Sequence, residues 1–319
     1  MTSPSEMISP AVSVVIPTFN QPDFLEEALK SVLAQTFREF EIIVVNDGST
    51  DDTAQRLEGY SNRLRIINQE NLGIGAARNR GIETASGRYL ALLDHDDTWH
   101  PDKLAIQYQF MRSHPEAVGC SVPFTYSRPA GALGFDLSIR GDGGLVRDAL
   151  KQYAAGQLFL LSSVMMLDRE KVGDLRYETE RASIEDVALQ IRLLLRGPYG
   201  IAGDRPLAVY RVHPSNSANS AAHLFRGIKR LRTIERSGGF MPCTLDQQRA
   251  INSLISALGR KMLVAQAAVG QRLRGLNAYI AEFPHQLRNM RFKFLLIFPI
   301  LLLVPRAALR RFPSFRVRE

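Results

Sequence analysis

Three aspartates, Asp94, Asp96 and Asp97, lie within four residues of one another, directly after an apolar segment. Carboxylates this close together repel one another unless a cation or hydrogen-bond donors compensate their charge. A divalent cation is the simplest compensation, because Mg²⁺ typically takes one or two carboxylates and leaves positions for phosphate oxygens. The cluster therefore predicts a Mg²⁺ or Mn²⁺ site. The alternative is a solvated acidic turn that caps the helix expected near Lys103.

Polar residues also follow two other apolar segments. Thr18-Phe19-Asn20 comes after residues 12–16 (VSVVI), and Asn46-Asp47-Gly48-Ser49 comes after residues 41–45 (EIIVV). Ligands of open parallel sheets bind at the carboxyl ends of the strands, so we expect these side chains to lie near the aspartate cluster. A dinucleotide fingerprint is a weak interpretation of Gly73-Ile74-Gly75, because this segment does not follow the first strand.

The elements that must position these residues can be predicted from the apolar pattern. Continuous apolar runs are typical of strands buried on both faces, and apolar residues at helical spacing predict amphipathic helices. The expected strands are 12–16, 41–45, 64–68, 89–93, part of 117–128 and 158–167, and the expected helices are 24–33, 74–85 and 184–195. Such alternation indicates an α/β fold with a mostly parallel, Rossmann-like sheet flanked by helices.

The chain changes character along its length. We expect a flexible N-terminus at residues 1–11, an α/β domain at 12–216, a helical appendage at 217–287 and a basic, apolar segment at 288–319. A glycine-rich loop at 129–144 is long enough to be functional or mobile.

Positive charge is concentrated at the C-terminal end. The net charge is +8, and the last 32 residues contain eight basic residues against Glu319. They bracket the apolar run Phe294–Val304, which contains Pro299 and is shorter than the roughly 20 residues that span a bilayer. Apolar residues flanked by arginines favour contact with the anionic inner face of a cell membrane, and a nucleic-acid partner is not expected. The alternative is a C-terminal helix docked on the body or on a second chain.

The two cysteines and the N-terminal residues indicate the cellular compartment in which the protein is expected. Cys120 and Cys243 lie far apart and outside any metal-binding spacing, which predicts two reduced thiols. The N-terminal residues lack the basic and apolar regions of a signal peptide. We therefore expect a cytoplasmic protein that lies peripherally at the membrane, and the sequence leaves homo-oligomerisation open.

Four motifs occur together in a distinctive order. They are PTFN after the first strand, NDGS after the second, NLGIGAARNRG in the helix of residues 74–85, and LDHDD at the aspartate cluster. In this combination the chain resembles family 2 glycosyltransferases with the GT-A fold. The resemblance is dense from Val12 to about Leu104 and sparser to about His213.

The resemblance implies roles for residues of the nucleotide site. Asp47 is expected to hydrogen-bond the base, with Pro17, Thr18 and Asn20 lining the same pocket. Arg78 is expected near the nucleotide, or else in a structural ion pair with one of the aspartates.

The same resemblance implies roles around the diphosphate. Asp94 is expected to face the ribose, and Asp96 is expected to ligate Mg²⁺ or Mn²⁺. Asp97 and His95 are uncertain donor-site residues, and His95 occupies a position where the family frequently has a small residue.

Two downstream segments complete the expected site. Glu185 and Asp186 resemble the family's acidic pair at the acceptor site, with Asp186 as general base and Glu185 as the second candidate. Taken alone, an acidic pair in the first turn of a helix is an ordinary complement to the helix dipole. His213 of the segment YRVH is expected to reach the metal or the diphosphate, or to be structural, and Arg211 is an uncertain donor-site residue.

The resemblance implies an inverting transfer from a nucleoside diphosphate-sugar to a hydroxyl of a glycan or lipid-linked acceptor in cell-surface polysaccharide synthesis. A UDP-sugar is the preferred donor, with dTDP- and GDP-sugars as alternatives. The QxxRW motif of processive synthases is absent, since the only tryptophan is Trp99, which favours addition of single sugars. A catalytically silent nucleotide- or glycan-binding scaffold and a nucleotidyltransferase are the other hypotheses.

Overall fold

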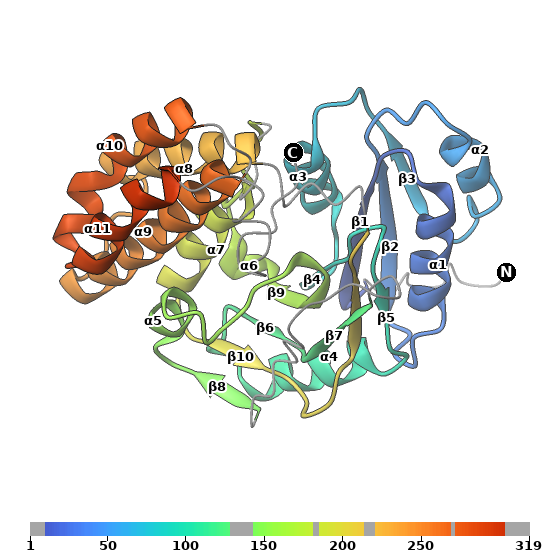
Figure 1. Cartoon of the computed structure of the whole chain (residues 1–319). Helices are drawn as coiled ribbons and strands as arrows, with labels where there is room; N and C mark the ends of the chain where they lie inside the picture. The colour runs from blue at the N-terminus through green and yellow to red at the C-terminus, as the bar shows by residue number, and fades with distance from the viewer. Residues whose placement is uncertain (1–9, 128–142, 181–184, 214–220, 269–271, 304–319) are drawn as a thin grey trace, which may run out of the picture.

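The computed structural model describes residues 10–127, 143–180, 185–213, 221–268 and 272–303. A central sheet has the strand order β3-β2-β1-β4-β9-β6-β10-β8, and a smaller sheet has the order β5-β11-β7 (Figure 1). The strands are β1 Val12–Thr18, β2 Phe40–Asn46, β3 Arg65–Asn68, β4 Tyr89–Leu92, β5 Thr98–Trp99, β6 Gly119–Ser121, β7 Phe124–Ser127, β8 Gly144–Val146, β9 Met165–Asp168, β10 Tyr199–Ile201 and β11 Ala208–Arg211.

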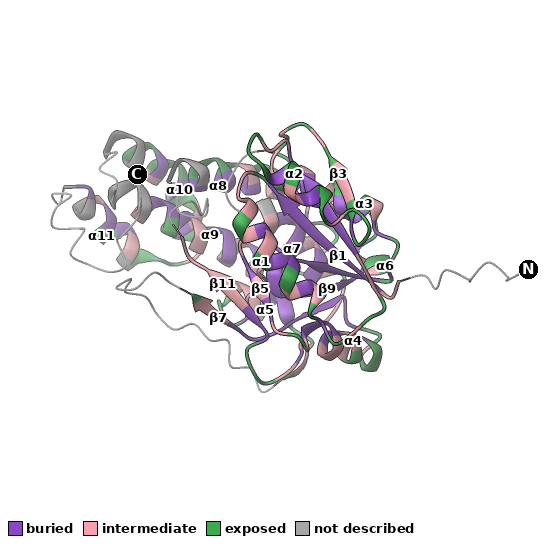
Figure 2. Ribbon diagram, turned by 90° about the vertical axis from the view of Figure 1, so that its right-hand side faces the viewer, coloured by how far each residue is buried: buried purple, intermediate pink, exposed green. Residues whose placement is uncertain are grey.

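Helices pack around the central sheet and continue beyond it. They are α1 Pro22–Leu33, α2 Thr53–Glu58, α3 Ile74–Thr84, α4 Lys103–Ser113, α5 Ala149–Ala154, α6 Arg169–Val172, α7 Glu185–Leu195, α8 Ala221–Arg236, α9 Leu245–Ala268, α10 Arg272–Arg288 and α11 Phe292–Leu303, with a 3₁₀ turn η1 at Ser162–Val164. Figure 2 shows buried central strands with exposed residues on the outer sides of α2 and α4. All seven residues of β1 are buried, as expected of a central strand covered on both faces.

The N-terminal half of the sheet is parallel, as expected. β1 pairs in parallel with β2 and β4, and β2 pairs in parallel with β3. All their carboxyl ends therefore lie at one edge, which brings the segments after Thr18, Asn46 and Leu92 together.

Beyond β4 the sheet is mixed rather than mostly parallel. β9 is antiparallel to both β4 and β6, and β8 is antiparallel to β10. The expected strand 158–167 is wrong in its first half, because only Met165–Asp168 is a strand and η1 precedes it. The hydroxyl of Ser163 in η1 accepts a hydrogen bond from the Asp94 backbone at 3.0 Å, so this segment leaves the ladder to support the turn after β4.

The small sheet connects distant parts of the chain. β5 begins directly after Asp97 and pairs antiparallel with β11, which in turn pairs in parallel with β7. This pairing places the end of β11, and hence Arg211 to His213, beside the aspartate turn.

Helices α8 to α11 gather on one side of the sheet (Figure 1). α9 packs against α5, α8 and α10. Leu231 of α8 and Ile255 of α9 belong to the same buried cluster as Val15 of β1. The helices thus share a core with the α/β part of the chain.

The apolar segment near the C-terminus forms α11. Leu295, Phe298 and Leu302 are buried, and α11 packs mainly against α10. Phe292 and Leu296 are exposed, so α11 is docked on one side only. Among the described residues no helix is long and apolar enough to cross a membrane. The rest of the expected tail, residues 304–319, lies outside the described residues, as does nearly all of the loop 129–144.

Both cysteines are free thiols, as expected.

Candidate active site

Asp96 and His213 meet although 117 residues separate them in the chain. Nε2 of His213 lies 2.8 Å from Oδ2 of Asp96, and both side chains are largely buried. The ring of Phe24 in α1 packs against the imidazole, with the ring centroids 5.0 Å apart. The structure therefore brings together the two side chains that were predicted to hold the metal.

Asp97 faces the interior of the protein. It is fully buried, and its Oδ1 accepts a hydrogen bond from the backbone N–H of Arg211 at 2.9 Å. Burial, reinforced by the charges of Asp96 and Asp94, raises the pKa of Asp97 well above its usual range. Asp97 thus fixes β11 against the aspartate turn.

Asp94 forms the ion pair that was the alternative expectation for Arg78. Oδ1 of Asp94 lies 2.7 Å from NH2 of Arg78. Arg78 projects from α3 and is almost wholly buried, with its guanidinium 5.0 Å from the centroid of the Tyr177 ring. The pair joins α3 to the end of β4. Removing either partner would leave a buried charge without compensation, which is destabilising.

Both carboxylate oxygens of Asp47 accept hydrogen bonds from the loop that follows β3. Its Oδ1 accepts hydrogen bonds from Gln69 and from the Leu72 backbone, and its Oδ2 accepts one from the Gly73 backbone at 2.8 Å. The neighbouring Gly48 has a φ of 74°, and a Cβ there would meet the Asn71 backbone nitrogen at 2.7 Å. This turn therefore requires glycine.

The segment after β1 is tied to the loop after β2. The Asn20 amide group and backbone contact Thr50 and Ser49. Pro17 and Thr18 are buried at the end of β1, and the Thr18 hydroxyl has no hydrogen-bond partner among the described residues.

His95 and Arg211 point to different neighbours. Nδ1 of His95 lies 3.3 Å from the carbonyl oxygen of Pro17. Arg211 forms an ion pair with Glu27 at 2.5 Å, and its guanidinium lies 5.0 Å from the centroid of the Phe24 ring. These two uncertain residues therefore link the aspartate turn and β11 to β1 and α1.

Asp186 comes into the same region from α7. Burial and the nearby charge of Asp94 raise the pKa of Asp186, while Arg78 opposes the rise. Nε2 of Gln190 donates a hydrogen bond to Oδ2 of Asp186 at 3.1 Å. Glu185 is the first residue of α7, and its side chain lies outside the described set.

Sequence reasoning missed the residues that hold this carboxylate and the Asp94 turn. Gln190 also donates to the Leu160 carbonyl at 2.6 Å and accepts a hydrogen bond from the Tyr153 hydroxyl. Ser163 supports Asp94, as described above. The contact of Gln190 could have been predicted, because Gln190 lies one helical turn after Asp186. The role of Ser163 could not, because Ser163 lies in an apolar segment whose pattern predicts a strand.

The donor atoms of Asp96 and His213 are of types that a divalent cation can use. Across the described ranges, no three side chains of the types His, Cys, Asp and Glu gather as a metal site. The Asp96 and His213 donor atoms, however, are 2.8 Å apart, close to the ~3 Å expected between adjacent ligands of an octahedral ion with bonds of about 2.1 Å. Two protein ligands leave most positions to water and phosphate oxygens, as in other phosphate-linked Mg²⁺ sites.

Comparison with known proteins identifies the family of the chain. Residues 13–136 match the family model described as glycosyl transferase family 2. A Bacillus subtilis protein, TuaG, whose name assigns it to teichuronic acid biosynthesis as a glycosyltransferase, is 35% identical over 246 residues, which cover 73% of this chain and 94% of that protein.

Two solved structures share the fold. S. aureus TarS 1–349 in complex with UDP-GlcNAc has a TM-score of 0.57 at 19% identity, covering 79% of this chain and 85% of that one. The mannosyltransferase PcManGT of Pyrobaculum calidifontis, in complex with GDP-Man and Mn²⁺, has a TM-score of 0.57 at 17% identity, covering 94% and 89%. With the aspartate turn, the NDGS loop and the acidic start of α7 converging at one sheet edge, the chain belongs to the family 2 glycosyltransferases and is a glycosyltransferase enzyme.

Proposed function

We propose that this enzyme is metal-dependent and inverting, and that it transfers a sugar from a nucleoside diphosphate-sugar to a hydroxyl of a glycan or lipid-linked acceptor. The observation that carries the proposal is the convergence of three separately anchored carboxylates. Asp96 pairs with His213, and Asp94 pairs with Arg78. Asp186 lies close enough to Arg78 and Asp94 for their charges to shift its pKa.

The donor end is built by the first three parallel strands. Thr18, Asn20 and Asp47 line the predicted base pocket at the ends of β1 and β2. Asp94 faces the ribose in this proposal, and Arg78 holds its carboxylate in place. Asp96 and His213 would hold Mg²⁺ or Mn²⁺, which would neutralise charge on the leaving diphosphate. The imidazole ligand favours Mn²⁺, because Mg²⁺ prefers oxygen ligands.

The acceptor end is built by α7. Asp186 takes the proton from the acceptor hydroxyl, and Gln190 fixes the orientation of its carboxylate. A raised pKa suits this role, since a base works best when its pKa approaches the operating pH. Glu185 is the second candidate. A single displacement by the activated hydroxyl inverts the anomeric centre.

The setting of the reaction is inferred from relatives and charge. TuaG is named for synthesis of a cell-wall polymer, which supports cell-surface polysaccharide synthesis here. Solved neighbours hold UDP-GlcNAc or GDP-Man, so a UDP-sugar is the first donor to test, with dTDP- and GDP-sugars next. The basic, apolar C-terminal segment supports peripheral contact with the inner face of the cell membrane.

A donor screen tests the proposal. With Mn²⁺ present, a nucleoside diphosphate-sugar should raise the melting temperature of the full chain. Asp96→Ala should weaken donor binding on the order of tenfold or more, because it removes a charged ligand. Asp174→Ala is the matched control, since Asp174 is an exposed carboxylate paired with Arg196, and it should bind as the native chain does.

Two results would sink the proposal. One is the absence of binding to every nucleotide sugar tested. The other is release of pyrophosphate from a nucleoside triphosphate, which a nucleotidyltransferase would produce.

A further inference from the structure

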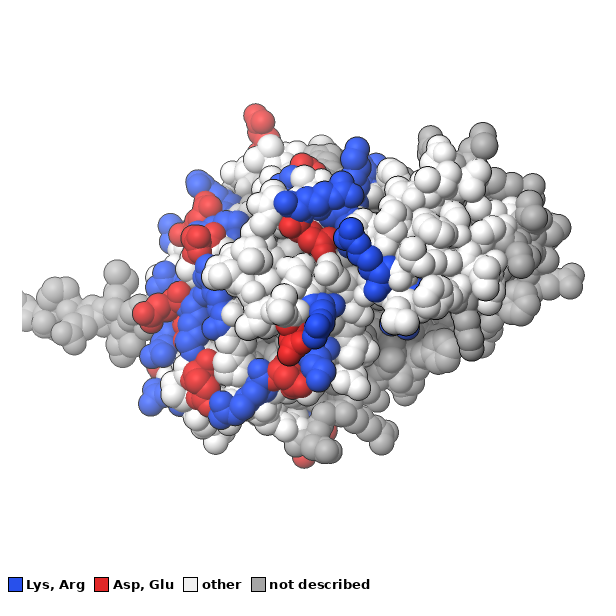
Figure 3. All heavy atoms as spheres, turned by 90° about the vertical axis from the view of Figure 1, so that its left-hand side faces the viewer, with Lys and Arg blue, Asp and Glu red and all other residues white. Residues whose placement is uncertain are grey.

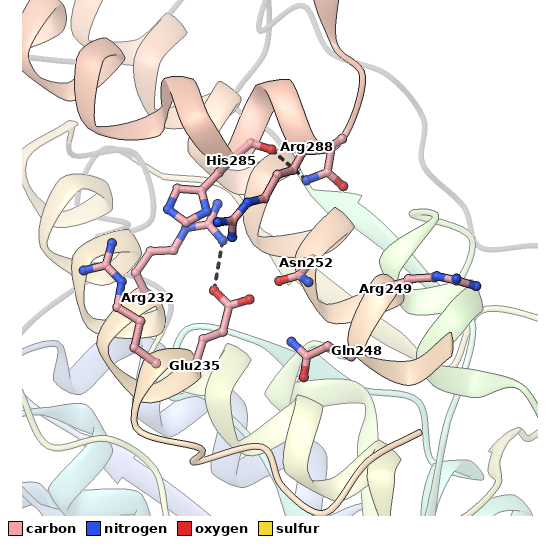
Figure 4. Close-up of a pocket in the computed structure, with 9 residues that line it drawn as sticks. Arg232, Glu235, Gln248, Arg249, Asn252, His285 and Arg288 are labelled. Carbon is pink, nitrogen blue, oxygen red and sulfur yellow. Dashed lines mark hydrogen bonds and ion pairs between the residues drawn. The ribbon is translucent and has the colours of Figure 1, made fainter. Parts of the chain in front are cut away.

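A cavity outside the active site lies between α8, α9 and α10. It has a volume of about 370 Å³, and four of the residues that line it are arginines, namely Arg232, Arg236, Arg249 and Arg288. Figure 4 shows Arg232 from α8 with His285 and Arg288 from α10 at one end of this cavity, while Arg249 points away from them. Cations gathered in one cavity repel one another unless carboxylates or a bound anion compensate.

Two of the four arginines are compensated within the protein. The buried Arg232 lies 3.0 Å from Glu235 and 3.1 Å from Glu282, and it also bonds the Ser256 hydroxyl. Arg249 lies 3.0 Å from the exposed Asp246.

The other two arginines, Arg236 and Arg288, differ from these. Within the described parts of the chain, no carboxylate pairs with Arg236 or Arg288. These guanidinium groups therefore leave the cavity with positive charge that an anion can neutralise. Arginine binds phosphate through paired hydrogen bonds, because its planar guanidinium matches the spacing of two phosphate oxygens.

The cavity continues into an apolar space. A second cavity of about 310 Å³ shares Arg232, Arg236 and His285 with the first, and its other walls include Ile228, Met262 and Ala278. All three apolar side chains belong to one cluster that joins α8, α9 and α10. The two cavities adjoin at these three shared residues, and we call them together the α8–α10 groove; the first is rich in arginine, and the second adds apolar side chains beside Lys229 and Glu282. That combination matches a ligand with a phosphate group attached to a hydrocarbon chain.

The outer side of α10 carries an apolar stripe. Leu276, Ile280, Phe283 and Leu287 are exposed by 43%, 61%, 40% and 46%. Their spacing of four, three and four residues puts them on one face, opposite the face that buries Ala278, Glu282 and Gln286.

The apolar surface extends onto the neighbouring helix. Phe292, Leu296 and Ile297 of α11 are at least half exposed. Figure 3 shows a broad area without charged residues on the side where these helices lie. A continuous apolar surface of this kind marks an interaction site. Because Arg288 and the exposed Arg291 lie beside it, an anionic bilayer is the surface that matches both features.

We propose that Arg236 and Arg288 of the α8–α10 groove bind the phosphate group of an anionic lipid at the edge of the bilayer contact, because Arg288 both lines the groove and follows the exposed Leu287 of the apolar face of α10 and α11 that rests on the bilayer. The inference deepens the membrane contact of the proposed function and does not depend on the donor site. It assigns that contact to folded helices, and so differs from anchoring by the C-terminal tail alone.

Vesicle sedimentation of the full chain tests the groove. The chain should bind vesicles that contain phosphatidic acid more tightly than vesicles of phosphatidylcholine alone. Arg236→Gln/Arg288→Gln should weaken binding to the anionic vesicles on the order of tenfold or more, since each basic residue near such a surface contributes appreciably. The matched control is Arg147→Gln/Arg205→Gln, which removes the same charge from exposed arginines that lie outside the groove and pair with Glu116 and Asp102.

The apolar face is tested separately. Ile280→Ser/Leu287→Ser should weaken binding to the same vesicles, and because both side chains are exposed the fold should survive. Donor-induced thermal shift of each variant checks that the fold is intact. It also separates the two hypotheses, since loss of donor binding with intact vesicle binding would count against the proposed function alone.

Three outcomes would overturn the inference. Equal loss in the control double variant would indicate unspecific attraction by net charge. Equal binding to anionic and neutral vesicles would show that the chain does not recognise the anionic lipid phosphate. Stabilisation by inorganic phosphate that needs Arg236 and Arg288, without vesicle binding, would identify the ligand as a soluble phosphate compound.

Discussion

Each carboxylate of the active site is stabilised by a different kind of partner. Asp47 accepts hydrogen bonds from backbone and amide N–H groups, Asp94 pairs with a guanidinium, and Asp96 meets an imidazole. Asp186 accepts a hydrogen bond from the neutral Gln190 amide at 3.1 Å, and the charge of Arg78 offsets part of the rise in its pKa. A carboxylate with a raised pKa and a neutral partner is the one best suited to accept a proton.

Asp186 predicts both a variant and a pH profile. Asp186→Asn should lower kcat by a factor on the order of 10² to 10⁴ and leave donor affinity unchanged, because the amide cannot take a proton. A base must be deprotonated to act, and the pKa of Asp186 is raised above the usual 3.8 by burial and by Asp94. In the native enzyme kcat should therefore rise with pH through that raised value. A kcat that stays flat over the acid range, or full turnover by the variant, would rule out this role.

The sequence predicts which residues belong to the candidate site better than it predicts the contacts that these residues make. The aspartates follow apolar runs, so their place at a sheet edge follows from strand prediction. That Asp97 is buried under Arg211 depends on the β5–β11 pairing. β5 has only two residues, which is too short to leave a periodic pattern.

At the scale of elements, α3 packs tightly against β1 on one side and against the segment around Tyr177 and Glu178 on another. A Cβ at Gly75 would meet the backbone oxygen of Glu178 at 2.2 Å, and a Cβ at Gly81 would meet Val15 at the same distance. The side chain of Asn79 exchanges two hydrogen bonds with the backbone of Tyr177. This close packing lets Arg78 reach Asp94 from the middle of the helix.

Gly75→Ala should therefore destabilise the protein. Alanine favours a helix over glycine by about 1 kcal/mol, but the new methyl group has no room beside backbone atoms, and overpacking costs about 1–3 kcal/mol. Gly59→Ala is the control, because its Cβ would meet only the Arg56 oxygen at 3.4 Å. Chemical denaturation measures both, and an unchanged or increased free energy of unfolding for Gly75→Ala would contradict the packing argument.

The elements that were predicted well are those with strong periodicity. β1, β2, α1 and α3 lie within about two residues of their expected bounds, because long buried runs and amphipathic helices leave unambiguous patterns. The expected strand within 117–128 is two strands, β6 and β7, separated at Val122-Pro123. The direction of β9 depends on tertiary pairing, and an apolar run carries no information about it.

At the scale of the whole molecule, the helices beyond β11 and the sheet are joined by one core. Leu231, Ile234 and Ile251 pack with residues of α5 and α7. Arg192 of α7 also donates to the Gly239 carbonyl at 3.1 Å. Removing one part would expose apolar surface on the other, so neither is expected to be stable alone.

Unfolding should therefore follow one transition. Trp99, the single tryptophan, lies in β5 beside the active site and reports on the α/β part by fluorescence. Helical circular dichroism includes a large contribution from α8 to α11. The two signals should have the same midpoint in urea. Separate midpoints would mean that the helices unfold as an independent unit and would contradict the shared core.

The contact between Asp96 and His213 also has a consequence for synthesis. A ribosome makes the chain from its N-terminus, so β1 to β4 and the aspartate turn emerge while the partner histidine has yet to be translated. During that interval the three aspartates have no imidazole, and β5 has no β11 to pair with. A nascent chain stalled at that stage would contain the motifs by which the family is identified, but neither the Asp96–His213 contact nor the β5–β11 pairing. The aspartate turn thus acquires its full set of neighbours only after translation passes His213.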